Sequence, residues 1–201
     1  MTGLPTLFLV RHGETEWSRN GRHTGKTDLA LTQAGRDQAS ALKLRMARGS
    51  FDHVLTSPMR RARETCTLAG LGVGASVDGD LSEWDYGAYE GRTSRDIRAE
   101  APGWSVFEDG CPGGESPSQV SDRADRVIAG LKAGGGRIAL FSHGQFGCAL
   151  AARWIGLDVV ASQHFALAAG SLSILGPKPG HPRIPAIIGW NIASLADVDG
   201  L

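Results

Sequence analysis

Two apolar segments of this chain end in the same way, and this repetition limits the possible folds more than any other feature. Residues 7–10 are followed by Arg11-His12-Gly13, and residues 138–141 are followed by Ser142-His143-Gly144. Short apolar runs that stop at a glycine are typical of buried strands. Ligands of open α/β sheets bind outside the carboxyl ends of the strands. If the two strands are neighbours, the two imidazoles meet at one edge of a sheet.

The rest of the chain alternates between expected strands and expected helices. Strands are expected at 6–11, 53–56, 75–77 and 137–142, followed by two antiparallel strands near 171–175 and 184–193. Helices are expected from Thr32 to about Arg48, from Ser57-Pro58 to about Leu71, and over 94–100, 116–131 and 144–155. On the first helix, Ala34, Ala39, Leu42 and Met46 have the spacing of one apolar face.

This alternation predicts a three-layer α/β/α sandwich with a mainly parallel sheet. A length of 201 residues is typical of a single domain, which we expect to span 1–201. Residues 13–31 and most of 79–117 are interpreted as loops because glycine, proline and polar residues gather there. The loop-rich segment 79–117 is predicted to form a small lid.

The composition argues against several kinds of partner and compartment. Basic and acidic side chains number 21 each, which gives no sign of a surface for nucleic acid or for a membrane. Three cysteines without a CxxC motif favour a reducing compartment over a disulfide framework. With no signal peptide or membrane-length apolar run recognised, a cytoplasmic location is expected. The sequence does not determine the oligomeric state, and a homo-oligomer is one of the options.

The first His-Gly motif carries the chemistry expected of a phosphoryl-transfer site. A neutral imidazole is a nucleophile near neutral pH, and an adjacent guanidinium binds phosphate oxygens in a fixed geometry. His12 and Arg11 therefore predict attack on a phosphoryl group. Segment 57–63 adds a hydroxyl and three arginines at a predicted helix N-terminus, a natural anion site. The three arginines cannot all point inward.

Among the remaining titratable residues, Glu83 and His23 are candidates for functional roles. Glu83 lies in a loop of carboxylates and aromatic rings, where a carboxyl group can keep a proton and act as a general acid. His23 is a candidate for lining the pocket. The other three histidines, His53, His164 and His181, are interpreted as structural. With no GxxxxGK[ST] or HExxH motif, neither an ATPase nor a zinc hydrolase is indicated, and neither metal nor cofactor is expected.

Short motifs typical of one protein family extend over nearly the whole chain. In order they are Arg11-His12-Gly13-Glu14-Thr15-Glu16-Trp17, Gly21-Arg22-His23-Thr24-Gly25 with Asp28 and Leu31-Thr32, Thr56-Ser57-Pro58 with Arg61-Ala62 and Thr65, Glu83 with Gly87 and Glu90-Gly91, Pro112-Gly113-Gly114-Glu115-Ser116, and Ser142-His143-Gly144. With these motifs the chain resembles the histidine phosphatase superfamily, in its phosphoglycerate-mutase-like branch. Within that branch it is most similar to sugar-bisphosphatase-type members.

The resemblance assigns a role to each matching residue. It implies that His12 is the phosphorylated nucleophile, that Arg11, Arg61 and His143 bind the phosphate, and that Glu83 is the proton donor. It also implies substrate contacts by Ser18, Thr24, Gly25, Tyr86, Gly144 and Gln145. Ser18 and Gln145 stand where many relatives have asparagine, although both still form hydrogen bonds.

The segment 102–112 favours one activity within the family. Mutases of the family carry an arginine-bearing lid that binds the substrate carboxylate, whereas this segment has no Arg or Lys. Its Trp104, Phe107 and Asp109 are expected to meet a sugar chain. These features predict a phosphomonoesterase acting on a small phosphorylated metabolite, such as a sugar phosphate or bisphosphate. Two alternatives stay open: a cofactor-dependent phosphoglycerate mutase and a catalytically silent phosphate-binding or interaction module.

Overall fold

A six-stranded sheet forms the centre of the computed structural model, which describes residues 3–47 and 49–192. Its strands are β1 (Thr6–Arg11), β2 (His53–Thr56), β3 (Ser76–Val77), β4 (Arg137–Ser142), β5 (Leu172–Lys178) and β6 (His181–Ile192). Their spatial order is β3-β2-β4-β1-β5-β6. The first four strands in that order are parallel, and β5 is antiparallel to both of its neighbours. The predicted α/β class with a mainly parallel sheet and two antiparallel late strands is confirmed.

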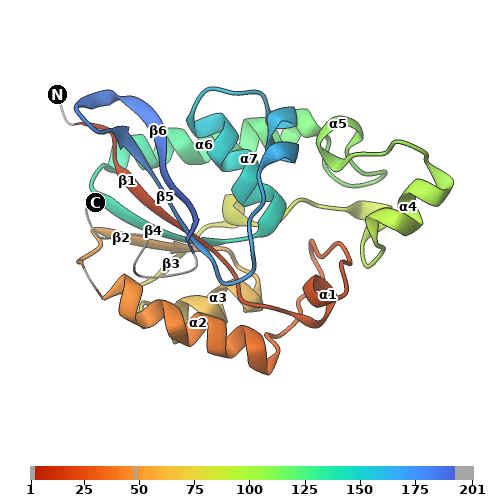
Figure 1. The fold of residues 1–201 in the computed structure, drawn as a ribbon, viewed down its shortest axis with the longest axis horizontal. Coiled ribbons are helices and arrows are strands. Elements are labelled where there is room, and N and C mark those ends of the chain that lie inside the picture. Colours follow the sequence, from red (N-terminus) through yellow and green to blue (C-terminus); the bar gives the residue numbers. More distant parts are fainter. Residues whose placement is uncertain (1–2, 48, 193–201) are drawn as a thin grey trace.

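Helices cover both faces of the sheet (Figure 1). Helices α2 (Gln33–Met46) and α3 (Arg60–Leu68) lie on one face, and α6 (Pro117–Gly134) and α7 (Gly144–Trp154) lie on the other. The pleat of β1 serves both layers, because Leu7 and Leu9 pack in the core with α6 and α7, while Val10 packs with α2 and α3. This arrangement is the expected three-layer sandwich.

Helix α2 begins where the sequence predicts, but its buried face differs. The Thr32 hydroxyl accepts a hydrogen bond from the backbone N–H of Gly35, which makes Thr32 the N-cap. Ala34, expected on the apolar face, is exposed, and Gly35 is buried in its place. The helix ends at Met46. The predicted end at Arg48, like the predicted strand end at Ala193, lies outside the described residues.

Helix α3 begins later and ends earlier than predicted. It starts at Arg60 after the N-cap Met59, so Ser57 and Pro58 are not its first turn. The Ser57 hydroxyl instead accepts from the N–H of Met59 and bonds to the ring of His143, which holds this connection outside the helix. The helix ends at Leu68, three residues before the predicted end at Leu71.

The two predicted loop segments contain short helices. Residues 13–31 include α1 (Glu16–Arg19), and Thr15 and Ser18 form a capping box at its N-terminus. Segment 79–117 contains the expected α4 (Ser94–Glu100) and an unexpected α5 (Val106–Asp109). Both lie beyond the carboxyl ends of the parallel strands, on the same side as α1 (Figure 1). The movement of this segment as a lid stays a prediction.

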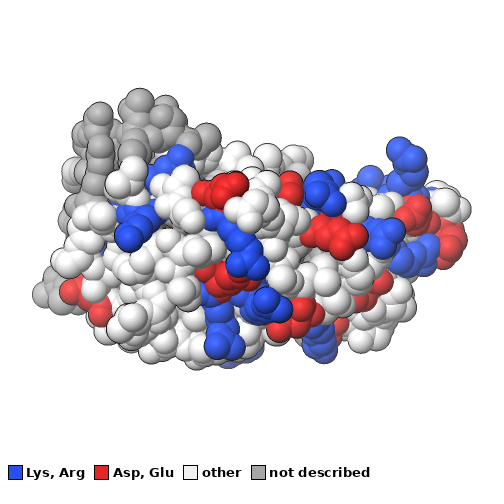
Figure 2. Space-filling model, turned by 90° about the horizontal axis from the view of Figure 1, so that it is seen from below, with Lys and Arg blue, Asp and Glu red and all other residues white. Residues whose placement is uncertain are grey.

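The surface carries charged side chains of both signs. Seen from the side of α2, acidic and basic side chains are interspersed among uncharged ones (Figure 2). Within residues 3–47 and 49–192, no helix combines the length and the apolar character that crossing a membrane requires.

Candidate active site

The two His-Gly motifs meet at the carboxyl edge of the sheet. Strands β1 and β4 are neighbours, and Arg11 lies opposite Ser142 in their register. The backbone N–H of His12 donates to the Ser142 carbonyl over 3.0 Å. The ring centroids of His12 and His143 are 5.1 Å apart. The juxtaposition expected from the sequence is therefore present.

His12 has the geometry and charge state of a nucleophile. Its Nδ1 lies 2.8 Å from the Gly13 carbonyl, which can only accept, so Nδ1 carries the proton and Nε2 is unprotonated. The side chain is only 4% exposed. Burial first, and then the positive charges of Arg61 and Arg11, lower the pKa of His12 well below its ordinary value. A neutral imidazole with a free Nε2 is the form that can attack phosphorus.

Bonds to both ring nitrogens fix the tautomer of His143. The Arg61 Nε–H donates to Nδ1 over 3.2 Å, so Nδ1 must be unprotonated. The proton therefore lies on Nε2, which is 2.7 Å from the Ser57 hydroxyl oxygen. Burial and the neighbouring Arg61 lower the pKa of His143 well below its ordinary value. The sequence placed the Ser57 hydroxyl at a helix N-terminus, whereas its observed role is to orient His143.

Arg61 lies behind the site and connects its parts. It is fully buried, whereas Arg60 and Arg63 are exposed, as the crowding of three arginines requires. Besides His143, its guanidinium donates to the carbonyls of Thr27, Thr24 and Gly25 at 2.8–3.1 Å. Four of its five N–H groups are thus engaged, and one Nη1 hydrogen is left uncommitted.

Arg11 provides a free donor beside the N-terminus of α7. Its Nη1 donates to the Leu167 carbonyl, while its buried Nε has no hydrogen-bond partner among the described residues. A Cβ added at Gly144 would lie 3.2 Å from the Arg11 Cζ, so the glycine lets the guanidinium lie close to the start of α7 without a shift. A buried donor without a partner is costly, and a bound anion would satisfy it.

Glu83 lies among hydrogen-bond donors, and these differ from the surroundings that the sequence predicts. The backbone N–H groups of Trp84 and Phe146 donate to Oε1 at 2.9 and 2.8 Å. Those of Gly144 and Gln145 donate to Oε2 at 2.9 and 3.1 Å. Four backbone donors, three of them at the N-terminus of α7, thus bind the two carboxyl oxygens. The sequence around Glu83 shows no sign of the three donors in α7, because they lie 61 to 63 residues further along the chain.

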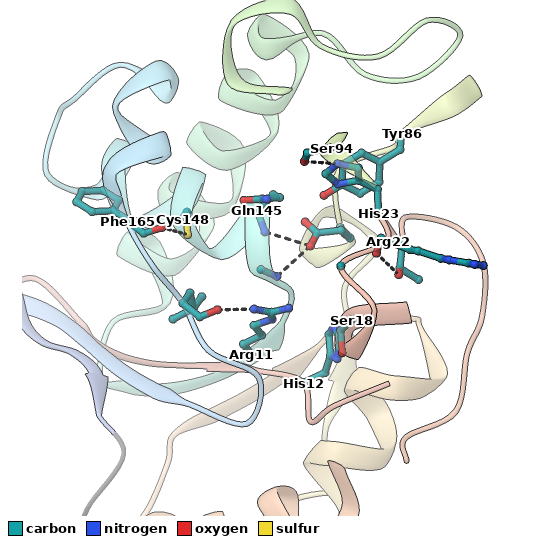
Figure 3. Close-up of a pocket in the computed structure, with 15 residues that line it drawn as sticks. Arg11, His12, Ser18, Arg22, His23, Tyr86, Ser94, Gln145, Cys148 and Phe165 are labelled. Atoms are coloured by element: carbon teal, nitrogen blue, oxygen red, sulfur yellow. Dashed lines mark hydrogen bonds between the residues drawn. The ribbon is translucent and has the colours of Figure 1, made fainter. Parts of the chain in front are cut away.

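These groups surround a cavity of about 300 Å³, here called the His12 pocket (Figure 3). Its lining residues are Arg11, His12, Ser18, Gly21, Arg22, His23, Thr24, Glu83, Tyr86, Ser94, Gly144, Gln145, Cys148, Phe165 and Leu167. Most predicted site residues are among them, including His23. Arg61, His143 and Gly25 are not, because they form the layer behind the lining. The Ser18 hydroxyl bonds to both the N–H and the carbonyl of Thr15, so the cap of α1 already engages it.

The structure places three residues that were expected to meet the substrate outside the lining of the His12 pocket. Trp104 and Phe107 are 5% and 7% exposed and pack in the core, where the Trp104 indole N–H donates to the Gly110 carbonyl. Asp109 is exposed, accepts a hydrogen bond from the Ser105 N–H, and lies outside the His12 pocket.

Other lining residues had no assigned role in the sequence. Arg22 is an exposed cation on the pocket, contributed by the segment before Thr24 rather than by 102–112. Ser94 lines the pocket from the first residue of α4. Cys148, Phe165 and Leu167 form an apolar wall beside Arg11. The sequence held no signal for these contacts, which depend on how distant loops pack. Among the described residues, no group of three or more His, Cys, Asp or Glu side chains is arranged to hold a metal ion.

Comparison with known proteins gives consistent matches over most of the chain. A family model described as the histidine phosphatase superfamily, branch 1, matches residues 7–189. An acid phosphatase of Mycobacterium tuberculosis is 44% identical over 187 residues, which cover 91% of each chain. A sedoheptulose 1,7-bisphosphatase of Saccharomyces cerevisiae is 36% identical over 188 residues, covering 77% of this chain and 69% of the relative. The solved structure of an open-reading-frame product of M. tuberculosis superposes with a TM-score of 0.84 and 42% identity, covering 93% of this chain and 98% of the other.

Proposed function

This chain belongs to the histidine phosphatase superfamily and is a phosphatase, and from that premise we propose that it hydrolyses a sugar phosphate or bisphosphate through a phosphohistidine at His12. The observation that carries the proposal is the protonation state of His12. Its Nδ1 is committed to the Gly13 carbonyl, and its buried ring is neutral, so Nε2 is available for attack.

The first half of the reaction transfers the phosphoryl group to the enzyme. The Nε2 lone pair forms a bond to phosphorus while the bond to the leaving oxygen breaks. Arg11 stabilises charge on the phosphoryl oxygens, and Arg61 adds its positive charge from the layer behind the pocket lining. His143, oriented by Arg61 and Ser57, lies beside His12 at the same centre. The sugar alkoxide needs a proton, which the mechanism assigns to Glu83.

Binding of the phosphate can convert Glu83 from a carboxylate into an acid. The N–H groups of Gly144 and Gln145 now bind its Oε2, and the turn containing them is the expected phosphate contact. A phosphate that takes over these donors removes two stabilising bonds from the carboxylate and places an anion beside it. Both changes favour protonation of Glu83. In the second half, the carboxylate accepts a proton from the water that attacks the phosphohistidine.

Three features support a sugar phosphate as the substrate class. A cavity of about 300 Å³ is near the lower limit of roughly 300–1,000 Å³ for ligand pockets, which suits a small metabolite. The side of the pocket away from Arg11 carries the uncharged groups of Tyr86, Ser94 and His23. A relative with 36% identity is a sedoheptulose 1,7-bisphosphatase. Arg22 lines the rim of the pocket, and it would reach the second phosphate of a bisphosphate only after its side chain turned from the direction shown in Figure 3.

The same cation keeps a mutase as the second candidate. Arg22 can also bind the carboxylate of a phosphoglycerate, although segment 102–112 contributes no cation. In a mutase the phosphohistidine would return its phosphate to the bound product instead of to water.

The test combines trapping of the intermediate with two turnover assays. Acid-free quenching under alkaline conditions, followed by mass spectrometry, is expected to find phosphate on His12 in the wild-type protein. Phosphate release from sedoheptulose and fructose bisphosphates is measured beside a coupled mutase assay, with and without 2,3-bisphosphoglycerate. His12→Asn is expected to abolish turnover and labelling, whereas His181→Asn, at an exposed position on β6, serves as the control.

Each outcome separates the candidates. Rapid phosphate release with little interconversion of phosphoglycerates supports the proposal. Cofactor-dependent mutase turnover with negligible phosphate release overturns it in favour of the mutase. If neither turnover nor labelling is found, the protein is a silent phosphate-binding module. Full turnover of His12→Asn would reject His12 as the nucleophile.

A further inference from the structure

We propose that His23, held by Ser94, is a specificity-determining residue that hydrogen-bonds a hydroxyl group of the substrate's leaving group. The inference rests on the proposed function and extends it from the phosphate to the rest of the substrate. His23 and Ser94 both line the His12 pocket, and Figure 3 shows them on the opposite side of it from Arg11 and His12.

Contacts on several sides hold the His23 ring in place. The ring stacks at a tilt on Tyr86, with centroids 4.5 Å apart, and meets Trp104 edge-on at 5.4 Å. Its Nε2 lies 3.1 Å from the Ser94 hydroxyl. Backbone hydrogen bonds to Arg92 and Gly91, each 2.9 Å long, bind the residue to segment 79–117. Such a ring loses little freedom when it binds a ligand.

One ring nitrogen is left for a ligand. Nε2 is bonded to Ser94, while Nδ1 makes no hydrogen bond to any residue within 3–47 and 49–192. Nδ1 is also not among the fully buried polar atoms that lack a partner in those residues, so it retains contact with solvent. The Ser94 hydroxyl can donate to Nε2 or accept from it, so Nδ1 can present either an N–H or a lone pair.

The charge state of this wall selects neutral groups. Burial lowers the pKa of His23 to about 4, against the opposing effect of Glu90, so the imidazole is uncharged at neutral pH. A second anion gains no ionic partner from His23, Ser94 or Tyr86. Figure 3 shows the Arg22 side chain extending away from these three residues.

A hydroxyl group fits this site better than other substrate groups. A hydroxyl both donates and accepts, so it can pair with Nδ1 in either tautomer, whereas a carboxylate only accepts. Tyr86 covers one face of the ring, which leaves its polar edge for recognition. The matching leaving group is therefore a polyol or sugar, with a hydroxyl some distance from the phosphorylated oxygen.

The experiment compares a hydroxyl-bearing substrate with one that has none. The ratio of kcat/KM for a sugar bisphosphate to kcat/KM for 4-nitrophenyl phosphate is measured in wild type, His23→Phe, Ser94→Ala and His181→Phe. Phenylalanine keeps an aromatic ring against Tyr86 but removes both nitrogens. His181 is an exposed histidine remote from the pocket lining and provides the matched control.

Loss of one neutral hydrogen bond is expected to lower the ratio about 3- to 10-fold in His23→Phe. Ser94→Ala, which only loosens the ring, is expected to lower it less, and His181→Phe to leave it unchanged. A series of singly deoxygenated sugar phosphates adds a second test. Removing the recognised hydroxyl lowers kcat/KM in wild type but has no such effect in His23→Phe.

The outcomes distinguish the inference from the function on which it rests. Equal losses on both substrates in His23→Phe would show that the ring acts only by packing, and would overturn the inference while the sugar phosphatase stands. If wild type shows no preference for sugar phosphates over 4-nitrophenyl phosphate, the proposed substrate class fails and the inference falls with it. If His23→Phe does not fold, Ser94→Ala and the deoxygenated substrates still decide the question.

Discussion

At the scale of single residues, the proposed mechanism requires Glu83 to serve two charge states in one reaction. Four backbone N–H groups bind its carboxylate, yet the departing alkoxide needs its proton. Glu83→Gln is expected to lower kcat on sugar phosphates by roughly 10²- to 10⁴-fold, because an amide cannot supply that proton. The loss on 4-nitrophenyl phosphate should be smaller, since its leaving group needs little protonation. Steady-state assays on both substrates measure the difference.

The surroundings of Glu83 also predict a structural cost of the same change. An amide has one acceptor oxygen, so its NH₂ group would face two of the backbone donors that now bind the carboxylate. The melting temperature of Glu83→Gln is therefore expected to fall as well, and thermal unfolding checks this. Equal kinetic losses on the two substrates would mean that Glu83 positions other groups rather than donating a proton.

At the scale of elements, the proposed mechanism predicts that the N-terminus of α7 couples phosphate binding to protonation. If an anion takes the N–H groups of Gly144 and Gln145 from Glu83, binding should be accompanied by proton uptake. Calorimetry with vanadate in buffers of different ionisation enthalpy measures that uptake. Wild type is expected to take up more protons than Glu83→Gln, which corrects for any uptake by His12 and His143. Identical uptake in the two proteins would show that Glu83 keeps its donors when the anion binds.

The contact between α2 and the loop after β1 is a second feature at this scale. A Cβ added at Gly35 would lie 2.1 Å from the Glu14 carbonyl oxygen, and one at Gly13 would lie 2.3 Å from the Gly35 carbonyl oxygen. Gly35→Ala must push the loop carrying His12 away from α2, which is expected to cost about 1–3 kcal/mol or more.

A matched glycine on another helix provides the control. A Cβ added at Gly130, on an exposed position of α6, meets nothing within 4 Å. Gly130→Ala is expected to stabilise the protein by roughly 0.5–1 kcal/mol, because alanine favours helix. Chemical denaturation of both variants measures the two effects. A Gly35→Ala protein as stable as wild type would show that α2 and the loop can separate at no cost.

The sequence predicts the bounds of elements that depend on local signals, but not those of elements that depend on contacts with distant residues. Strand β1 and helix α4 have the expected bounds because apolar runs and the Thr93 cap are local signals. The predicted start of α3 was wrong because the Ser57 hydroxyl bonds to His143, 86 residues away. The pairing of His12 with His143 followed from two strand ends, whereas the donors around Glu83 and the wall at His23 required the packed loops.

At the scale of the whole molecule, buried neutral histidines make stability depend on pH. Burial lowers the pKa values of His12 and His143 well below the ordinary value, and that of His23 from 6.5 to about 4. Below about pH 6.5 the unfolded chain binds protons that the folded protein does not, so the free energy of unfolding falls as pH falls. For His23 this loss accumulates as the pH falls from 6.5 to about 4, and it amounts to about 3 kcal/mol at 1.36 kcal/mol per unit of pKa.

His23→Phe isolates one of these contributions, because the variant has no imidazole to protonate when it unfolds. Chemical denaturation at neutral pH and at about pH 4.5 gives the free energy of unfolding at each pH, and the difference is the loss of stability for each protein. The loss is expected to be smaller in His23→Phe than in wild type by about 2–3 kcal/mol. His181→Phe, which removes an exposed histidine, is the control for the general effect of removing an imidazole. If His23→Phe and wild type lose the same amount, the imidazole must become protonated in the folded protein, and the uncharged wall argued for the His12 pocket would not exist below pH 6.5.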